Sequence, residues 1–292
     1  MRQEFKKHES DIKVSIGDDC AVFKDGTIVT KDIFSEGTHF ILKKMKPYNI
    51  GWRCFAAALS DIAAMAGTPL HSLLAIGIPS ELEVEKLKEI VEGIKSLSSL
   101  FKVDLIGGDT IGSKFLFISF TIIGKAKKPV LRSGAKIGDT IYITGSIGNA
   151  RMGYMLLRSG ESPTDKFLKP IPKIREAKEL IKNYHINSMI DISDGVLMDA
   201  DHISEESGVG IDISSKNLPI SESVIEFCKN QGFDPVLFSL ESGDEYELLF
   251  SSPDEVDLPY VKKIGKIISQ KGIFIDGRRA KIEGFDHFRS EI

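Results

Sequence analysis

The chain alternates short apolar runs with amphipathic segments, and this alternation limits the possible folds more than any other feature of the sequence. Apolar runs bounded by glycine, proline or polar residues predict strands at 27–30, 72–78, 115–123, 140–144 and 246–250. Helical spacing of apolar residues predicts helices at 52–65, 80–97, 174–183, 197–207 and 223–230. A protein that combines sheets with helices follows from this order of elements.

Local signals set the expected ends of some of these elements. Gly67 is expected to end the helix at 52–65. Ser80 is expected to start the next helix, with Glu83 completing a capping box. The run at 115–123 is almost continuously apolar, so we expect a strand that is buried on both faces. The apolar residues expected on one face of the helix that starts at Ser80 are Leu87, Ile90, Val91, Ile94 and Leu97.

The segment 124–136 differs in composition from the sequence on either side, because it contains several basic residues, Pro129 and a Ser-Gly pair. We place a domain boundary here and expect domains at 1–128 and 129–292. A chain of 292 residues is long enough for two ordinary domains, each with its own core.

Composition excludes several classes of protein. Hydrophobic residues make up 42% and charged residues 27%, a balance typical of soluble globular proteins. The net charge of −4 and the lack of a long basic run argue against nucleic-acid binding. Three scattered cysteines indicate a reducing compartment. The polar first eleven residues do not resemble a signal peptide, and no apolar stretch is long enough to span a bilayer, so we expect a cytoplasmic protein without membrane contact.

Several acidic residues lie in glycine-flanked turns or beside buried apolar runs, unlike the acidic residues at 81–92, which are typical of a solvated helix face. Hard divalent ions prefer carboxylate oxygens, and Mg²⁺ is usually held by one or two carboxylates together with phosphate oxygens. Carboxylates gathered from distant segments would repel one another unless cations lay between them. The set therefore predicts a Mg²⁺ site, whereas the lack of His/Cys clusters argues against Zn²⁺. Its members are Asp18, Asp19, Asp32, Asp61, Asp109, Asp191, Asp194, Asp244 and Glu245.

Each of these turns also has a purely structural interpretation, because Asp-Gly pairs are ordinary turn chemistry. Asp109 follows a strand expected to end at Ile106, where an open α/β sheet places its ligands. The glycine turn at 145–149 follows a strand and is only a weak candidate for phosphate binding, and the sequence contains no P-loop. Because such acidic turns recur across the chain, we favour a functional role for them over a purely structural one.

These motifs, in this order, resemble the thiamine-monophosphate kinase family, whose superfamily includes aminoimidazole ribonucleotide synthetase and selenophosphate synthetase. The matching segments extend from one end of the chain to the other, and SDIAAMAG together with MIDISDG is the most specific part. They are IGDDCAVF (16–23), VTKDIFSEGTHF (29–40), GWRCFAAALSDIAAMAGTPL (51–70), LIGGDTIGS (105–113), LRSGAKIGD (131–139), MIDISDGVLMDADHI (189–203), SGDEYELLF (242–250) and GFDHF (284–288).

The resemblance implies a two-domain α/β plus α+β protein. Its N-terminal α/β domain would bind ATP and Mg²⁺ and form a homodimer through its sheet, and its C-terminal domain would be α+β, with the active site in the cleft between them. The implied reaction is direct in-line transfer of the γ-phosphoryl group of ATP to thiamine monophosphate, with Mg²⁺ as cofactor. No strong general base is needed, because the accepting phosphate oxygen is already ionised at neutral pH.

The resemblance also implies roles for particular residues. Mg²⁺ ligands are implied at Asp19, Thr30, Asp32, Asp61, Asp109, Asp191 and Asp194. Contacts to ATP are implied at Gly108, Asp109, Arg132 and Ser193, and contacts to the acceptor at His39, Asp244 and Phe285. Among these residues, Asp109, Arg132 and Asp194 are expected to carry catalysis.

Two positions depart from the family pattern. Lys31 stands within a segment that is usually Thr-Asp or Ser-Thr-Asp, and Asp244-Glu245 reverses the usual Glu-Asp pair. On a strand, Lys31 and Asp32 point to opposite faces, so the ammonium group either lies away from the metal site or swings in and replaces one cation. Two other functions remain open: an enzyme resembling aminoimidazole ribonucleotide synthetase, and a nucleotide-binding relative without catalysis.

Overall fold

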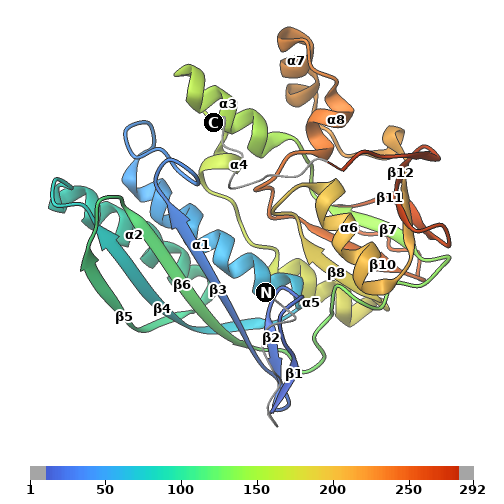
Figure 1. The fold of residues 1–292 in the computed structure, drawn as a ribbon, viewed down its shortest axis with the longest axis horizontal. Coiled ribbons are helices and arrows are strands. Elements are labelled where there is room, and N and C mark those ends of the chain that lie inside the picture. The colour runs from blue at the N-terminus through green and yellow to red at the C-terminus, as the bar shows by residue number, and fades with distance from the viewer. Residues whose placement is uncertain (1–10, 283–292) are drawn as a thin grey trace. The chain divides into compact units, whose positions relative to one another are not determined.

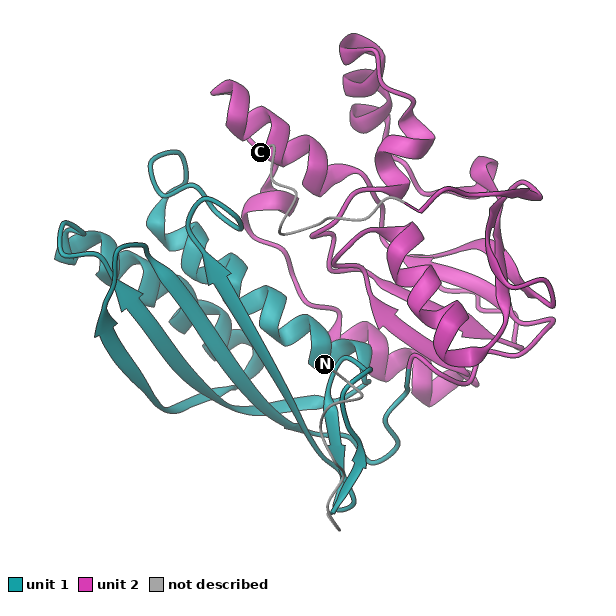
Figure 2. Ribbon diagram, viewed as in Figure 1, with its two compact units in different colours: residues 1–131 teal, residues 132–292 magenta. Residues whose placement is uncertain are grey.

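The computed structural model describes residues 11–282 and divides into two compact units, residues 1–131 and 132–292 (Figure 2). Each unit has its own sheet and helices, and each is described separately below (Figure 1). Within the described part of the chain, no helix has the length and apolar character needed to cross a membrane.

Unit 1 is built on a six-stranded sheet in the order β1-β2-β3-β6-β4-β5. All neighbours are antiparallel except β4 and β5, which are parallel. The parallel pair is joined by a helical crossover, as parallel strands require. The strands are β1 (Ile12–Val14), β2 (Ala21–Phe23), β3 (Thr27–Ser35), β4 (Thr68–Ile78), β5 (Asp104–Gly112) and β6 (Phe117–Lys125).

Helices α1 (Pro47–Ala64) and α2 (Val84–Phe101) lie on one face of this sheet (Figure 1). Helix α1 packs on β3, β4 and β6, and α2 packs along α1. The two helices meet backbone to backbone, because a Cβ atom at Gly51 would lie 1.9 Å from the Ile90 carbonyl oxygen, and one at Gly93 would lie 2.0 Å from the Tyr48 carbonyl oxygen. Any larger residue at either glycine would force the helices apart.

Three expectations about these helices are wrong. Helix α1 begins at Pro47 instead of residue 52, at a position where the missing N–H of proline is tolerated. The residue that adopts the left-handed conformation after the helix is Ala66 (φ 51°) and not Gly67. Helix α2 begins at Val84, with Glu83 as a cap that makes no side-chain hydrogen bond, so there is no capping box from Ser80. Val91 is 44% exposed and does not join the buried face of that helix.

Strand β6 only partly matches its expected burial on both faces. Ile118, Phe120 and Ile122 are fully buried on the side of α1, but the alternating residues Phe117 and Thr121 are only half-buried. The opposite face of the sheet carries no helix of this unit (Figure 1). The strand expected at 115–123 is therefore present two residues further along, at Phe117–Lys125, but its second face is only partly buried.

Unit 2 contains a seven-stranded sheet in the order β13-β12-β9-β11-β7-β10-β8. Only β12 and β9 are parallel. The strands are β7 (Thr140–Thr144), β8 (Ser188–Asp191), β9 (Gly210–Ile213), β10 (Leu248–Ser252), β11 (Val261–Ile268), β12 (Gly272–Ile275) and β13 (Arg278–Arg279).

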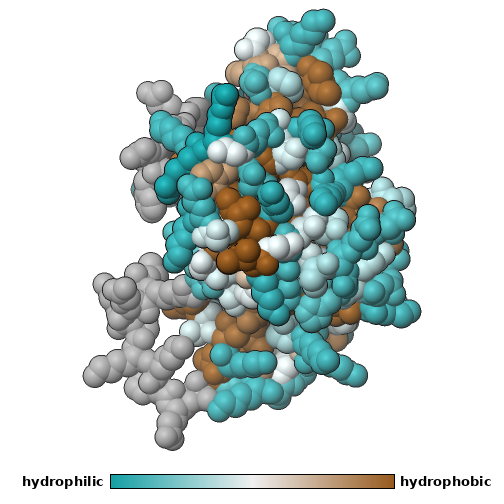
Figure 3. All heavy atoms as spheres, turned by 90° about the vertical axis from the view of Figure 1, so that its right-hand side faces the viewer, coloured by the Kyte–Doolittle hydropathy of each residue, from teal (hydrophilic) through white to brown (hydrophobic). Residues whose placement is uncertain are grey.

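Helix α6 (Val196–Ser207) packs on β8, β9, β10 and β12 and closes the main core of unit 2. A smaller cluster of Met152, Val224, Cys228 and Phe238 joins three other helices. The remaining elements are α3 (Asn149–Ser159), α4 (Asp165–Leu168), α5 (Ile174–Asn183), the 3-10 helix η1 (Ser215–Asn217), α7 (Glu222–Gln231) and α8 (Pro235–Leu240). The side of the molecule in Figure 3 is largely hydrophilic, with hydrophobic residues in small groups.

Candidate active site

In unit 1, the carboxylates of Asp19 and Asp61 come close together. Asp19 follows the turn before β2 and is 7% exposed, and Asp61 lies on the last turn of α1. One oxygen of each carboxylate lies within 4.8 Å of the other. The Thr30 hydroxyl, buried on β3, donates a hydrogen bond to Asp61 Oδ2. The structure thus brings together three of the residues for which the family resemblance implies Mg²⁺ binding.

Asp32 lies two residues along β3 from Thr30, so its side chain shares the face that α1 covers. Burial raises the pKa of Asp32 from its usual value of 3.8 to about 6, and the charge of Lys31 partly opposes this increase. A raised pKa means that ionising Asp32 costs free energy in the folded protein. The residue therefore contributes a pH-dependent term to stability.

We predict that Asp32→Asn makes the metal-free protein more stable at pH 8. The favourable contribution of Asp32 is fully present below pH 3.8, the unfolded value, and is lost as the pH rises through about 6. Two pKa units correspond to about 3 kcal/mol, so we expect a gain of about 1–3 kcal/mol at pH 8 that vanishes near pH 4. Urea unfolding in EDTA from pH 4 to pH 8 measures it.

Asp25 provides a control for this experiment, because its pKa is shifted in the opposite direction. Hydrogen bonds from Lys125 and Thr27 lower the pKa of its carboxyl group. Asp25→Asn should therefore lose stability, or leave it unchanged, above pH 4. A variant Asp32→Asn that is less stable than the parent protein at pH 8 would contradict the raised pKa.

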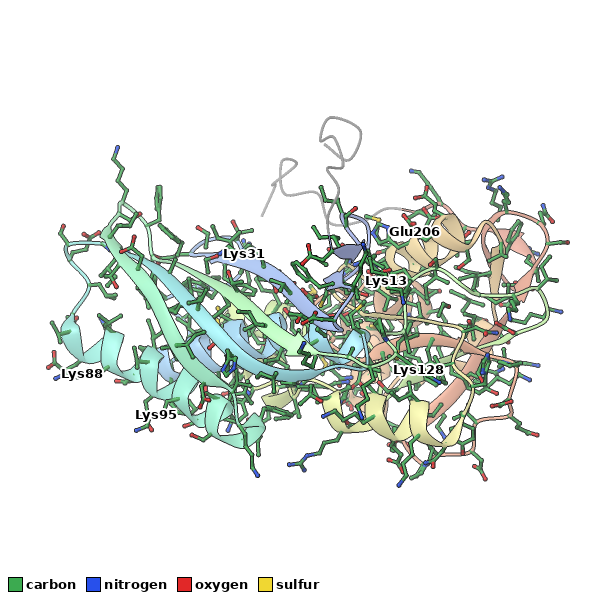
Figure 4. The ribbon with its side chains drawn as sticks, turned by 90° about the horizontal axis from the view of Figure 1, so that it is seen from below. Lys13, Lys31, Lys88, Lys95, Lys128 and Glu206 are labelled. Atoms are coloured by element: carbon green, nitrogen blue, oxygen red, sulfur yellow. The ribbon has the colours of Figure 1, made fainter. Side chains whose placement is uncertain are left out.

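Lys31 points away from these carboxylates. It is exposed on β3 (Figure 4). Its ammonium group donates a hydrogen bond to the Ser119 hydroxyl, which in turn donates to the Asp32 carbonyl oxygen at 2.5 Å. Ser119 lies opposite Ile33 in the register of β3 and β6, so both side chains lie on the face without a helix. This geometry favours the interpretation in which Lys31 does not replace a cation.

Asp109 does not join Asp19 and Asp61 within unit 1, contrary to the expectation. Strand β5 continues to Gly112 instead of ending at Ile106, so Asp109 lies in the middle of an edge strand rather than in a turn. It pairs with Ala75, which pairs with Ser119 on β6. Directly paired residues share a face, so Asp109 points to the same uncovered face as Ser119 and Lys31.

The glycine before Asp109 is required by the sheet. A Cβ atom at Gly108 would lie 1.8 Å from the carbonyl oxygen of Leu74, its partner on β4. The strand therefore reaches its position only with glycine here. This packing role accounts for Gly108 whether or not it contacts a ligand.

His39 lies in the loop after β3. Its Nδ1 accepts a hydrogen bond from the Ser35 backbone N–H at 3.1 Å, and its ring packs edge-on against Phe34 with a centroid distance of 5.5 Å. These contacts hold the imidazole in one orientation, which suits a residue that contacts a substrate.

In unit 2, the segment that follows β8 forms a tight loop. Asp191 ends the strand and is 2% exposed. Oδ2 of Asp199, on the first turn of α6, accepts hydrogen bonds from the backbone N–H groups of Ser193, Asp194 and Gly195 at 3.1–3.3 Å. One buried carboxylate thus organises the loop that carries three of the predicted site residues, and sequence reasoning assigned it no role.

The segment 242–247 is hydrogen-bonded to that loop. The Asp244 N–H donates to the Ser193 carbonyl at 2.8 Å, and the Tyr246 N–H donates to the Ile192 carbonyl at 2.9 Å. The Tyr246 hydroxyl donates to Asp244 Oδ1 at 2.6 Å. The motifs MIDISDG and SGDEYELLF therefore form one structural unit that contains Ser193 and Asp244.

For two further predicted site residues, Arg132 and Phe285, the structure describes only the backbone surroundings of the first. Arg132 is the first residue of unit 2, and its carbonyl oxygen accepts a hydrogen bond from the Ser207 hydroxyl at 3.3 Å. That hydroxyl also accepts from the Gly134 and Ala135 N–H groups, which fixes the backbone around the arginine. Phe285 lies outside the described residues.

The glycine turn at 145–149 is occupied by the protein's own carboxylate. Glu245 Oε1 accepts a hydrogen bond from the Ala150 N–H at 3.0 Å, in the first turn of α3. A negative charge is favourable at a helix N-terminus, so Glu245 takes the position that a phosphate would need. The weak phosphate-binding interpretation of this turn was wrong for that reason. Glu245 lies in the irregular segment before β10, so the strand pattern of the sequence did not indicate this role.

The carboxylates of unit 1 fit a hard divalent cation. Asp19 and Asp61 offer two oxygens at close range in a largely buried setting, and such pairs repel each other without a cation. Carboxylate and hydroxyl oxygens are the donors that Mg²⁺ prefers. The donor set therefore agrees with magnesium.

Comparisons with known proteins cover most of the chain. The family model described as AIR synthase related protein, N-terminal domain, matches residues 17–126, and the corresponding C-terminal domain matches residues 136–277. Thiamine-monophosphate kinase of Aquifex aeolicus (strain VF5) is 32% identical over 286 residues, which covers 94% of this chain and 92% of the relative. Thiamine-monophosphate kinase of Methanopyrus kandleri is 33% identical over 264 residues, covering 88% of this chain and 84% of the relative.

Solved structures also resemble this chain over most of its length. The structure of AaThiL complexed with AMPPCP and TMP has a TM-score of 0.89 at 31% identity, covering 94% of this chain and 92% of that one. Thiamine monophosphate kinase from Aquifex aeolicus has a TM-score of 0.86 at 30% identity, covering 92% and 93%.

Proposed function

The chain belongs to the AIR synthase related proteins and, among them, to the thiamine-monophosphate kinases, and we propose that it transfers the γ-phosphoryl group of ATP to thiamine monophosphate. The observation that carries this proposal is its likeness, over 94% of the chain, to a structure that holds AMPPCP and TMP. The product is thiamine diphosphate, and ADP is released.

We propose Mg²⁺ as the cofactor, held by Asp19, Thr30, Asp32 and Asp61 of unit 1 and by Asp109, Asp191 and Asp194. When bound, the metal would neutralise charge on the phosphate oxygens as the two anions approach. Thr30 supports this role by its hydrogen bond to Asp61, which orients the carboxylate. In unit 2, Asp199 would hold the loop of Asp191 and Asp194 in one conformation through its three N–H contacts.

The remaining residues would bind and orient the two substrates. Arg132 and Ser193, with the backbone at Gly108, would contact ATP, and His39, Asp244 and Phe285 would contact thiamine monophosphate. The accepting phosphate is ionised at neutral pH, so catalysis rests on charge neutralisation and in-line alignment instead of proton abstraction. The abundance of carboxylates and the lack of a histidine–nucleophile pair at this site, among the described residues, agree with that division of labour.

The proposal is tested by measuring ADP release with ATP, Mg²⁺ and three acceptor conditions: thiamine monophosphate, thiamine, and no acceptor. We expect ADP only with the monophosphate. ADP formed equally in all three conditions would indicate a different ATP-using enzyme, and none in any condition would indicate nucleotide binding without catalysis.

We further propose that two copies of the chain pair through the sheet of unit 1. Ile33 (62% exposed) and Ile111 (51% exposed) lie on the face without a helix. Ile33 is in the same row of paired residues as Asp109, and Ile111 is two residues further along β5. Within one copy, Asp109 is three strand spacings from β3, about 14 Å, and on the opposite face from Thr30. A second copy would cover the apolar side chains, and we propose that each metal site takes its Asp109 from the other copy.

We expect a stable homodimer at micromolar concentration, measurable by sedimentation equilibrium. Ile33→Glu should shift the protein toward monomer, because a charge would then be buried in the paired face. Glu89→Lys, on the solvated face of α2, serves as the control and should leave the mass unchanged. A monomeric parent protein would contradict the proposal.

Lys31 gives a prediction of no effect. Its ammonium group lies on the opposite face of β3 from Asp61 and binds Ser119, so it does not take the place of a cation between Asp19 and Asp61. Its charge acts on the neighbouring Asp32 alone among the carboxylates of unit 1 for which a pKa shift is resolved at this site. We expect Lys31→Thr to leave the Mg²⁺ concentration for half-maximal activity within about twofold of the parent protein, a change under about 0.4 kcal/mol. Mg²⁺ titrations at fixed ATP measure it, and a severalfold increase for the variant would revive the alternative in which the lysine replaces a cation.

A further inference from the structure

Two glutamates and two lysines form a buried charge cluster beside the 242–247 segment. Glu245 and Glu247 are 2% and 1% exposed. Lys166 Nζ lies 3.1 Å from Glu247 Oε1 and 3.6 Å from Glu245 Oε2, and Lys173 Nζ lies 3.3 Å from Glu247 Oε1. Lys166 is thus the lysine that contacts both carboxylates.

The two glutamates tie the segment to neighbouring elements. Glu245 Oε1 accepts hydrogen bonds from the Ala150 N–H and, at 2.6 Å, from the Ser242 hydroxyl. Glu247 Oε2 accepts one from the Thr144 hydroxyl at 2.6 Å, and that hydroxyl accepts from the Leu248 N–H. The segment is therefore attached to α3 on one side and to β7 on the other.

Between these attachments, two residues of the segment have backbone conformations that are unfavourable for their residue types. Asp244 has φ 59° and Tyr246 has φ 52°, both in the left-handed region that non-glycine residues seldom occupy. Such conformations are unfavourable and persist only when the surroundings impose them. The side chain that this backbone presents is that of Asp244.

Lys166 is what allows the two carboxylates to be buried so close together. Burial raises the pKa of Glu245, the neighbouring Glu247 raises it further, and the charge of Lys166 opposes both effects. Removing one partner from a buried ion pair leaves an uncompensated charge, which is far more damaging than losing an exposed pair. Lys166 also donates a hydrogen bond to the Ser146 carbonyl, which fixes its ammonium group beside the glycine turn.

We infer that Lys166 is a positioning residue for the acceptor: by neutralising Glu245 and Glu247, it holds the 242–247 segment in the conformation that presents Asp244. This inference rests on the proposed function, which assigns Asp244 to the thiamine monophosphate. Lys166 touches neither substrate in this account and acts through the loop alone. Its loss therefore weakens acceptor binding. ATP binding is kept, because Asp199 holds the loop of Ser193 through three backbone N–H groups that do not involve the 242–247 segment.

The experiment compares Lys166→Met with Lys169→Met, an exposed lysine in the same segment for which the described residues show no ion pair. We expect the KM for thiamine monophosphate to rise at least about tenfold in Lys166→Met, with the KM for ATP within twofold of the parent protein. Lys166→Arg should restore the acceptor KM to within threefold, because it keeps the charge. Lys169→Met should match the parent protein throughout.

Hydrogen exchange of the peptide containing 242–248 provides a readout that does not need activity. Lys166→Met should lose protection of the Asp244, Tyr246 and Leu248 amides, whereas peptides from β11 keep theirs. Should Lys166→Met fail to fold, the double variant Lys166→Met/Glu245→Gln, which removes the charge left behind, is expected to fold and to recover most of the protection. If the parent protein does not phosphorylate thiamine monophosphate, the proposed function is refuted. The hydrogen-exchange measurement would still show whether Lys166 holds the 242–247 segment in place.

Unchanged exchange and an unchanged acceptor KM in folded Lys166→Met would overturn the inference. An equal rise in both KM values would also overturn it, because a general loss of structure does not select one substrate.

Discussion

Asp61→Asn is expected to lower kcat/KM by at least about 100-fold at saturating Mg²⁺, equivalent to about 2.7 kcal/mol of lost transition-state stabilisation. The amide is neutral and a poor ligand for Mg²⁺, so unit 1 would lose one of the three carboxylates proposed to hold the ion. The side chain keeps its shape, and the amide oxygen still accepts the hydrogen bond from Thr30. Steady-state kinetics against ATP and thiamine monophosphate measure the effect.

The fold should survive this change, because Asp61 lies at the end of α1 and no packed apolar group is removed. The melting temperature of Asp61→Asn should therefore stay close to that of the parent protein. Glu89→Gln, an exposed acid on α2, is the matched control and should retain full activity. Near-normal activity of Asp61→Asn would remove this residue from the site.

Asp109→Asn is expected to be equally inactive alone, yet to recover activity when co-expressed with Asp61→Asn. If Asp109 acts on the partner's site, a mixed dimer contains one site with both substitutions and one site with neither. Random pairing makes half of the dimers mixed, so about a quarter of the parent activity should return. The recovery depends directly on the separation of Asp109 from Asp61 within one copy.

Asp104→Asn, at the start of the same edge strand, is the control for Asp109→Asn and should remain active in every combination. The mixture should be compared with each variant alone at the same total protein concentration. A mixture no more active than its components would mean that Asp109 and Asp61 serve the site of the same copy.

The longer regular elements could be predicted because periodicity is a local property. Within the described residues, seven strands were not predicted: β1, β2, β8, β9, β11, β12 and β13. The helix at 174–183 and the strand at 140–144 were predicted with their exact bounds, since each is a regular amphipathic or apolar segment. Helix α2 shows the limit of local signals: Ser80 and Glu83 have the spacing of a capping box, but the chain from Pro79 forms a turn and the helix starts at Val84.

The candidate site was predictable in its residue types but not in its geometry. Glycine-flanked aspartates indicated carboxylate ligands, and Asp19, Thr30 and Asp61 do come together. The sequence placed Asp109 with them because two glycines suggested a turn. Those glycines in fact let an edge strand continue, and the pleat then turns Asp109 to the other face.

Residues that act through other residues were the hardest to foresee. Asp199 lies in the matching segment 189–203 but was assigned no role there, and Lys166 lies in no matching segment. Each is identified by its partners, three backbone N–H groups for Asp199 and two buried carboxylates for Lys166. Such contacts join residues whose relation depends on the folded chain, so periodicity and spacing contain no trace of them.

The most direct test of the central claim follows the γ-phosphorus of ATP. The protein is incubated with γ-³²P-labelled ATP, Mg²⁺ and thiamine monophosphate, and the products are separated. Direct transfer predicts that the label appears in thiamine diphosphate, one labelled molecule for each ADP formed, and that little reaches inorganic phosphate. Label that accumulates in inorganic phosphate at a rate independent of thiamine monophosphate, with no labelled thiamine diphosphate, would contradict the account.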